Sequence, residues 1–205
     1  QGGINLKHRP VVVGFGPAGI FAALSLARCG FKPIVIERGE DVDKRSLSVD
    51  KFWEENILNT ESNVSFGEGG AGTFSDGKLN TMVKDKSGRN NEVLKTLVEF
   101  NAPKDILTDP KPHIGTDLLK GIIKNIREEI IRLGGEVRFS TKLEDINYKD
   151  KHLQSIKLSN GEILDCETLV LAIGHSARDT FELLYEKELN IEAKSFAVGL
   201  RVQHP

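Results

Sequence analysis

The sequence lacks the features that mark membrane and nucleic-acid-binding proteins. Its 28 basic and 30 acidic side chains nearly cancel, and lysine and arginine are spread along the chain. No basic face is therefore expected for a phosphodiester backbone. The longest apolar runs are far shorter than the ~20 residues of a membrane-spanning helix, and no signal-peptide pattern occurs. We expect neither nucleic acid nor a membrane among its partners.

Cysteine and methionine are also scarce. The two cysteines, Cys29 and Cys166, lie far apart and belong to no Cys-x-x-Cys or metal-ligand spacing. This usage is typical of the reducing cytoplasm and predicts neither a metal site nor a redox-active cysteine pair. The chain begins at Gln1 and its only methionine is Met82. We therefore expect a fragment of a longer protein, with residues 1–8 as linker or vector-derived sequence.

The first third of the chain contains an ordered series of apolar segments. Val11–Val13 is a β-branched run that breaks at a glycine turn. Residues 17–29 then repeat apolar side chains at helical spacing, and residues 33–36 form a second apolar run. This series predicts a βαβ unit whose parallel strands are buried on both faces.

The remainder predicts a mixed architecture. Apolar spacing indicates helices over residues 41–58, 91–100 and 116–133. Short or alternating segments indicate strands over residues 137–139, 142–148, 152–158 and 169–173, with a hairpin signal at Asn160-Gly161. The fold class is therefore α/β: a Rossmann-like domain with a parallel sheet and a crossover antiparallel β-meander. We also expect a helix after Ser176, with Ser176 as its N-cap, and a strand over residues 195–202.

The turn Gly14-Phe15-Gly16-Pro17-Ala18-Gly19 predicts a dinucleotide site. A Gly-x-Gly-x-x-Gly pattern is weak alone, but here it follows a strand, opens a helix and precedes Glu37 at the end of the next strand. Gly14 permits the tight turn, Gly16 lets a pyrophosphate approach the backbone, and Gly19 lets helix and strand pack closely. Glu37 is placed to accept from an adenosine ribose and would repel a 2′-phosphate, which favours FAD or NAD over NADP.

Four segments carry a family resemblance. Val11 to Gly19, with Ala23 and Glu37-Arg38-Gly39, looks like the first motif of the glutathione reductase-like flavoproteins, which have two dinucleotide-binding domains. Within that superfamily, the segments 62–79, 112–117 and 172–179 resemble the bacterial FAD-dependent dehydrogenases, also described as NAD(P)/FAD-dependent oxidoreductases.

The resemblance implies an FAD-binding domain over residues 9–194, whose sheet is completed by later sequence, and the start of a cap or substrate domain at 195–205. The implied function is that of a cytoplasmic dehydrogenase or reductase, which transfers hydride or electrons through flavin N5 to or from an unknown small molecule. NAD(P)H is an implied electron donor. The family's later Gly-Asp motif does not occur in this chain, so activity of the chain alone is not expected.

The resemblance also extends the candidate cofactor-binding residues beyond the first turn. The glycine-rich stretch from Gly67 to Gly77 is similar to a segment that passes close to the flavin, Leu143 matches a strand position beside adenine, and 168–174 looks like a second short motif ending in Ala-x-Gly. Their alternatives are a flexible surface loop, any alternating strand and a plain core strand. The full predicted set is Gly14, Gly16, Pro17, Ala18, Gly19, Glu37, Arg38, Arg45, Gly69, Gly70, Ala71, Gly72, Thr73, Leu143, Ala172 and Gly174.

Several polar residues remain open between two interpretations. Arg45 could reach the pyrophosphate, or be a solvated charge on an exposed helix. His175 and Arg178 follow a strand end, where either could meet flavin or substrate, and His113 is equally ambiguous. No catalytic residue is identified. Two rival functions remain: an NAD-dependent dehydrogenase, and a non-catalytic nucleotide-binding module.

Overall fold

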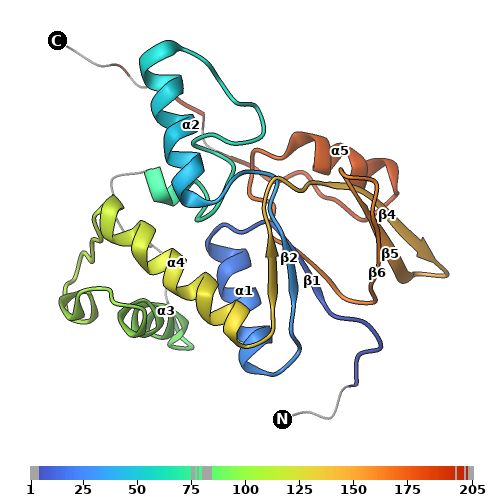
Figure 1. Ribbon diagram of the computed structural model, residues 1–205, viewed down its shortest axis with the longest axis horizontal. Helices are drawn as coiled ribbons and strands as arrows, with labels where there is room; N and C mark the ends of the chain where they lie inside the picture. The colour runs from blue at the N-terminus through green and yellow to red at the C-terminus, as the bar shows by residue number, and fades with distance from the viewer. Residues whose placement is uncertain are drawn as a thin grey trace.

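The computed structural model describes residues 5–74, 77, 79, 85–196, 198–200 and 202. Residues 1–4, part of the glycine-rich stretch (Ser75, Asp76) and part of the expected C-terminal strand lie outside the described residues. Figure 1 shows a central sheet with helices on one side and a second, smaller sheet on the other.

The central sheet is parallel. Its strands are β1 (Val11–Val13), β2 (Ile34–Ile36), β3 (Glu136–Arg138) and β7 (Leu169–Leu171), in the spatial order β3-β2-β1-β7. Val12 lies opposite both Val35 and Val170 in the register. The predicted parallel sheet is confirmed, and β7 joins it after the chain has formed the small sheet.

The side chains of the parallel strands alternate between two cores. Val12 and Val35 face one hydrophobic cluster, whereas Val11, Val13, Ile34 and Ile36 face a second cluster. All of them are at most 8% exposed. Both faces are therefore buried, which explains why these strands are runs of apolar residues rather than alternating ones.

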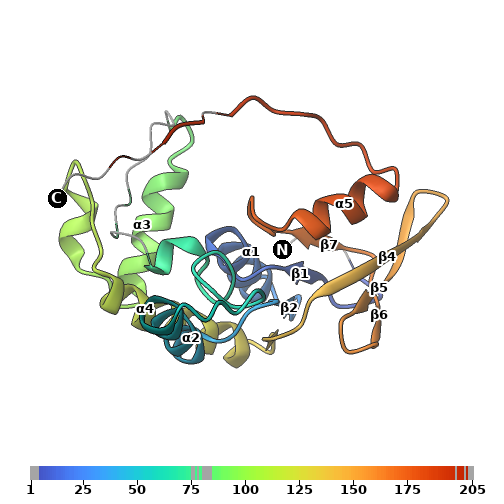
Figure 2. The same cartoon turned by 90° about the horizontal axis from the view of Figure 1, so that it is seen from above.

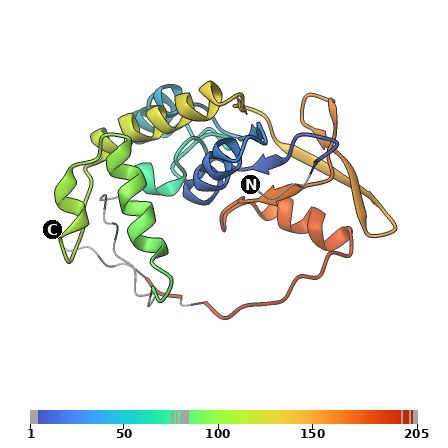
Figure 3. The same ribbon diagram turned by 90° about the horizontal axis from the view of Figure 1, so that it is seen from below.

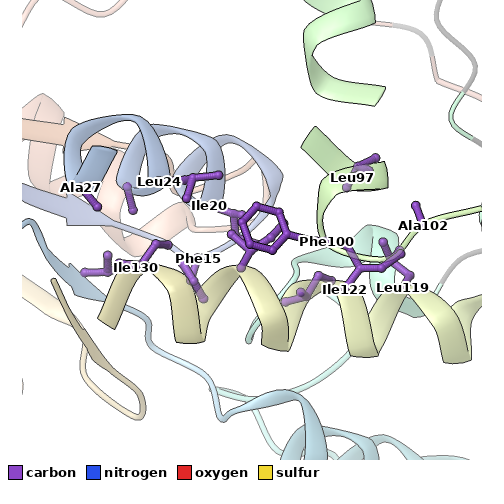
Figure 4. Packing of buried hydrophobic residues seen from close by; sticks show 14 of the residues in the cluster. Phe15, Ile20, Leu24, Ala27, Leu97, Phe100, Ala102, Leu119, Ile122 and Ile130 are labelled. Carbon is purple, nitrogen blue, oxygen red and sulfur yellow. The ribbon is translucent and has the colours of Figure 1, made fainter. Parts of the chain in front are cut away.

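Three helices cover the first face. They are α1 (Pro17–Arg28), α3 (Arg89–Glu99) and α4 (Thr116–Arg132). Apolar residues at helical spacing on α1 point toward a matching stripe on α4, and Phe100 at the end of α3 lies between them (Figure 4). Most of the apolar stripe expected over residues 116–133 is buried, namely Leu119, Ile122, Ile123, Ile126 and Ile130. Leu118, which belongs to the same expected stripe, is 54% exposed.

The second face is covered by an antiparallel meander and one helix. The meander comprises β4 (Leu143–Lys149), β5 (His152–Leu158) and β6 (Ile163–Asp165), and the helix is α5 (Arg178–Glu186). Leu143, Ile156 and Leu184 from these elements pack against the odd-numbered positions of β1. The meander lies in sequence between β3 and β7, as predicted.

A further helix and two single-turn segments complete the fold. The helix α2 (Val42–Glu55) begins after Asp41, whose carboxylate accepts from the N–H groups of Asp43 and Lys44. The 3₁₀ segments are η1 (Ala71–Phe74), which follows the buried part of the glycine-rich stretch, and η2 (Lys104–Leu107).

Two expectations near the C-terminus are wrong. The N-cap of α5 is Ala177, and it makes no side-chain capping bond; the Ser176 hydroxyl instead contacts the ring of His175, at 3.3 Å. No strand forms among the described residues of 195–202. Figures 2 and 3 show why, since the segment after α5 runs away from both sheets and meets no strand with which to pair.

Among the described residues, none of the helices combines the length and apolar character needed to cross a membrane.

Candidate functional site

A cavity of about 580 Å³ lies at the carboxyl ends of three parallel strands. Val13, Ile36 and Leu171, the last residues of β1, β2 and β7, all line it. Its volume is in the range of a small-molecule or cofactor pocket. The carboxyl edge of an open parallel sheet is also where α/β folds bind their ligands.

Most predicted site residues line this cavity. Those that do are Gly14, Gly16, Pro17, Ala18, Glu37, Arg38, Gly70, Ala71, Gly72, Leu143, Ala172 and Gly174. They come from five separate segments of the chain, the fifth being the start of β4 at Leu143. The structure therefore brings the first turn, the end of β2, the glycine-rich stretch and the end of β7 around one space.

Gly19, Arg45, Gly69 and Thr73 do not line the cavity. Gly69 and Thr73 are buried within the glycine-rich stretch, where a Cβ on Gly69 would lie 2.0 Å from Oγ1 of Thr73. Gly19 packs on the first turn, because a Cβ there would lie 1.8 Å from the carbonyl oxygen of Gly14. Direct contact of these residues with a cofactor stays a prediction.

The first turn is held by close backbone packing. Gly14 has a φ of +95°, and a Cβ there would lie 2.4 Å from the carbonyl oxygen of Ala172. Gly16 is different: its φ is −77°, and an added Cβ would meet only Gly70 at an ordinary 3.6 Å. Gly14 is thus required by the fold, whereas the protein itself leaves room for a side chain at Gly16. The free space beside Gly16 belongs to the cavity.

Glu37 joins three backbone segments. Its Oε2 accepts from the N–H of Phe15 at 2.7 Å, and its Oε1 accepts from the N–H groups of Gly39 and Gly67 at 2.9 and 3.0 Å. The side chain is 5% exposed. Its place at the end of β2 predicted a contact with a ribose, but no sequence pattern indicated that the same carboxylate joins the first turn to the glycine-rich stretch.

The described part of the glycine-rich stretch packs directly on the first turn. The N–H of Gly69 donates to the carbonyl of Phe15 at 2.8 Å, and the N–H of Glu68 donates to the carbonyl of Glu40 at 3.1 Å. Gly67, Glu68 and Gly69 are buried. These residues therefore do not form a flexible surface loop, which was the alternative interpretation.

Arg45 lies beneath that stretch rather than on the surface. Its side chain is 0% exposed, so the interpretation as a solvated charge on an exposed helix is wrong. Burial lowers the pKa of Arg45 to about 10, with the negative charges of Glu37 and Glu68 opposing that shift. The guanidinium therefore stays charged at neutral pH. Its contact with a pyrophosphate stays a prediction.

Glu68 is a second buried charge next to the stretch. Its Oε2 accepts from the N–H of Val42 at 2.8 Å and from Arg127 at 2.7 Å, and its side chain is 0% exposed. Burial raises the pKa of Glu68 above its usual value, although the Val42 N–H and the Arg127 charge act in the opposite direction.

A cluster of charges lies at the edge of the cavity near Glu37. Arg38 donates to Asp179 at 2.7 Å and to the hydroxyl of Thr180 at 3.2 Å, and its guanidinium lies 4.4 Å from the ring of Phe66. Lys142 approaches Asp179 at 3.4 Å. Burial alone would raise the pKa of Asp179, but Arg38 and Lys142 bring it below its ordinary value. These interactions connect the start of α5 to the residues that follow β2 and precede β4.

Sequence reasoning missed the contribution of α5. Thr180, Phe181 and Leu184 of this helix line the cavity, as do Phe66 and Lys142. The helical residues are spaced three and four apart, so they share one face, and that spacing could have indicated a buried stripe. Nothing in the sequence could show that the stripe faces a cavity.

The remaining polar candidates differ in whether they line the cavity. His175 lines the cavity, whereas the exposed Arg178 and His113 do not. No group of three His, Cys, Asp or Glu side chains among the described residues could hold a metal ion. Cys29 is exposed and Cys166 is buried, both as free thiols, and burial raises the pKa of Cys166 to about 11.

Comparison with other sequences finds one strong likeness. No family model matches the chain. An uncharacterized protein of Clostridium beijerinckii is 63% identical over 201 residues, which cover 98% of this chain and 37% of that protein. The chain thus spans little more than a third of the relative's length.

Comparison with solved structures gives the fold. L-amino acid deaminase from Proteus vulgaris matches over 94% of this chain and 58% of its own, with 12% identity and a TM-score of 0.58. THI4 of Thermovibrio ammonificans matches over 89% and 64%, with 17% identity and a TM-score of 0.55. OTEMO in complex with FAD and NADP matches over 82% and 26%, with 18% identity and a TM-score of 0.50.

At these identities the likeness concerns the fold alone. The predicted fold class is confirmed: the chain has the Rossmann-like α/β fold that occurs in the FAD-bound OTEMO structure.

Proposed function

We propose that this chain binds FAD and is the cofactor-holding part of a flavoprotein oxidoreductase. The observation that carries the proposal is the composition of the cavity: a glycine turn at a helix N-terminus, an acid at the end of the next strand and a glycine-rich stretch line one space of about 580 Å³. OTEMO, which shares the fold, was crystallised with FAD and NADP.

The turn at α1 suits a pyrophosphate. Gly16 is the N-cap of α1 and Pro17 its first residue, so the free N–H groups and the positive end of the helix dipole meet the cavity there. Gly16 has no side chain to keep a phosphate away from this backbone. A cofactor with two linked phosphates would therefore be anchored at the first turn.

Glu37 suits the adenosine ribose, even though its carboxylate is already hydrogen-bonded. A carboxylate has about four acceptor positions. Two N–H groups use Oε1 and one uses Oε2, which leaves a position on Oε2 for a ribose hydroxyl. The cost of a 2′-phosphate beside this buried carboxylate favours FAD over NADP here. Leu143, which also lines the cavity, would lie toward the adenine.

When bound, the flavin supplies hydride or electron transfer through its N5 atom. The residues of this chain hold and orient the cofactor, and none is assigned to a proton-transfer step.

Residues 9–194 would form the FAD-binding domain, and residues 195–205 would begin a cap domain. The partners would be a small-molecule substrate and NAD(P)H as electron donor. The finer assignment, to the bacterial FAD-dependent dehydrogenases, rests on the motif resemblance.

Reconstitution tests this proposal. The purified chain is mixed with FAD and passed through a gel-filtration column, and the protein peak should carry flavin absorbance near ~450 nm, a property of the cofactor. ADP should displace the FAD because it occupies the adenosine and pyrophosphate positions, whereas FMN should not. A colourless protein that instead binds NAD would contradict the proposal and support an NAD-dependent dehydrogenase.

A further inference from the structure

The guanidinium of Arg45 donates hydrogen bonds to the backbone of the glycine-rich stretch and to Asn63 before it. Its Nε donates to the carbonyl of Asn63 at 2.9 Å. Its Nη1 donates to the carbonyls of Glu68 at 2.7 Å, Gly70 at 2.9 Å and Gly67 at 3.3 Å. The ring of Phe74 lies 4.7 Å from the guanidinium carbon. One side chain of α2 therefore binds four carbonyls between residues 63 and 70.

These bonds fix the direction of the peptide groups. In a planar trans peptide the C=O and the next N–H point in opposite directions. The carbonyl of Glu68 points toward Arg45, and the next N–H, of Gly69, donates to Phe15 on the first turn. The carbonyl of Gly70 also points toward Arg45, so the N–H of Ala71 is directed away from it. Ala71 lines the cavity.

The stretch has little room to take another position. A Cβ on Gly70 would lie 3.0 Å from the Cα of Gly16. Gly67 has a φ of +120°, and a Cβ there would lie 2.4 Å from the Cδ of Arg45. The stretch thus fits between the arginine on one side and the first turn on the other, without a side chain from residues 67, 69 or 70.

Burying the charge of Arg45 costs free energy, so its position beneath the stretch needs an explanation. Among the described residues Nη2 of Arg45 has no hydrogen-bond partner, and the pKa of the guanidinium is lowered by burial. One physical reason to retain a buried charge is that its directed hydrogen bonds favour a single conformation of the backbone around it.

We propose that Arg45 is a positioning residue that holds residues 67–71 against the turn Gly14–Gly19, with the Ala71 N–H directed into the cavity, and that FAD affinity depends on this arrangement. The cofactor part rests on the proposed function. Arg45 acts through the backbone, so its own contact with the phosphates is not required.

The test compares three variants with the wild-type chain. Arg45→Met removes the charge and the donors but keeps much of the volume. Arg45→Lys keeps the charge with fewer directed donors. Ile156→Ala is the control for lost stability, because Ile156 is 1% exposed in the antiparallel sheet and does not line the cavity. Amide hydrogen exchange is measured without FAD, and FAD affinity is then measured by titration.

We expect the amides of Glu68, Gly69 and Gly70 to exchange at least about tenfold faster in Arg45→Met, with α4 and the parallel sheet unchanged. FAD affinity should fall at least about tenfold in Arg45→Met, less in Arg45→Lys, and by under about threefold in Ile156→Ala. The lysine variant separates the role of the charge from that of the shape.

Two results would overturn the proposal. One is unchanged exchange of these three amides in Arg45→Met, since the stretch would then be held without the arginine. The other is an equal loss of FAD affinity in Arg45→Met and Ile156→Ala. If the wild-type chain binds no FAD while exchange in the stretch still depends on Arg45, the proposed function is wrong and the assignment of Arg45 to the stretch stands.

Discussion

At the scale of single residues, buried polar groups connect the segments that line the cavity. Glu37 binds three N–H groups from the first turn, the end of β2 and the glycine-rich stretch. Arg45 binds three carbonyls of the same stretch, and that of Asn63 before it, from the other side. Backbone that is rich in glycine has high conformational entropy when unfolded, so such fixed partners are needed to give it one conformation.

Two glycines of the first turn should respond differently to the same substitution. Gly14→Ala places a Cβ 2.4 Å from a backbone oxygen at a positive φ, and should cost about 2–5 kcal/mol of unfolding free energy. Gly16→Ala meets only an ordinary contact and should cost about 1 kcal/mol or less. Urea denaturation of the chain without cofactor measures both values. Equal losses would show that the described turn is wrong.

The buried carboxyl of Glu68 should make stability depend on pH. Because burial raises its pKa in the folded state above the ordinary 4.5, the folded chain keeps this proton to a higher pH than the unfolded chain. The stability contributed by the protonated form is fully present below about pH 4.5 and is lost as the pH rises through the folded-state pKa.

Glu68→Gln isolates that contribution. The unfolding free energy of the wild type, compared with that of Glu68→Gln, should fall as the pH rises from 4.5 toward neutrality. Denaturation of both proteins across this range measures the difference. A difference that stays constant, or that changes in the opposite direction, would show that the pKa of Glu68 is not raised.

The residue-scale roles were only partly predictable. The spacing of Gly14, Gly19 and Glu37 indicates a turn, a close approach and an acid at a strand end, and the structure has each of them there. The burial of Arg45 could not be predicted from a helix of mixed charge, because its partners are backbone carbonyls. Carbonyls are present at every position and leave no sequence signal.

At the scale of elements, segments with an apolar face in a core were the most predictable. β1, α1 and β2 have apolar patterns set by the cores they enter, and the structure places them within about two residues of the predicted bounds. The expected strand over 195–202 is wrong for its described residues. Phe196, Val198 and Leu200 alternate with smaller residues, but they are 83%, 84% and 96% exposed, and a strand exists only with a partner to pair with.

A substitution in α4 tests whether that helix is as regular as the structure indicates. Gly121 lies on its exposed face, and a Cβ there would meet no atom within 4 Å. Gly121→Ala should therefore raise the unfolding free energy by about 0.5–1 kcal/mol, because alanine loses less backbone entropy in a helix. Thermal denaturation provides the measurement, and a loss of stability would mean that this face is covered or irregular.

At the scale of the whole molecule, topology brings the site together. β1 lies between β2 and β7, so the loops that follow all three strands meet at one edge of the sheet. The meander and α5 cover the second face, and α5 adds an apolar wall to the cavity. The sequence predicted the strands and the meander, but not that α5 would close the cavity, because the contacts that place α5 join residues far apart in the sequence: Leu184 with the second core, and Asp179 with Arg38 and Lys142.

The central claim is that the cavity holds FAD with its pyrophosphate against Gly16. The most direct test is a titration of FAD into the wild type, Gly16→Ala and Gly121→Ala, since a Cβ fits the protein at both glycines but would meet a pyrophosphate only at Gly16. Wild type and Gly121→Ala should bind about one FAD per chain with the same Kd, and Gly16→Ala should bind at least about tenfold more weakly. Equal binding by all three proteins, or no binding by the wild type, would contradict the account.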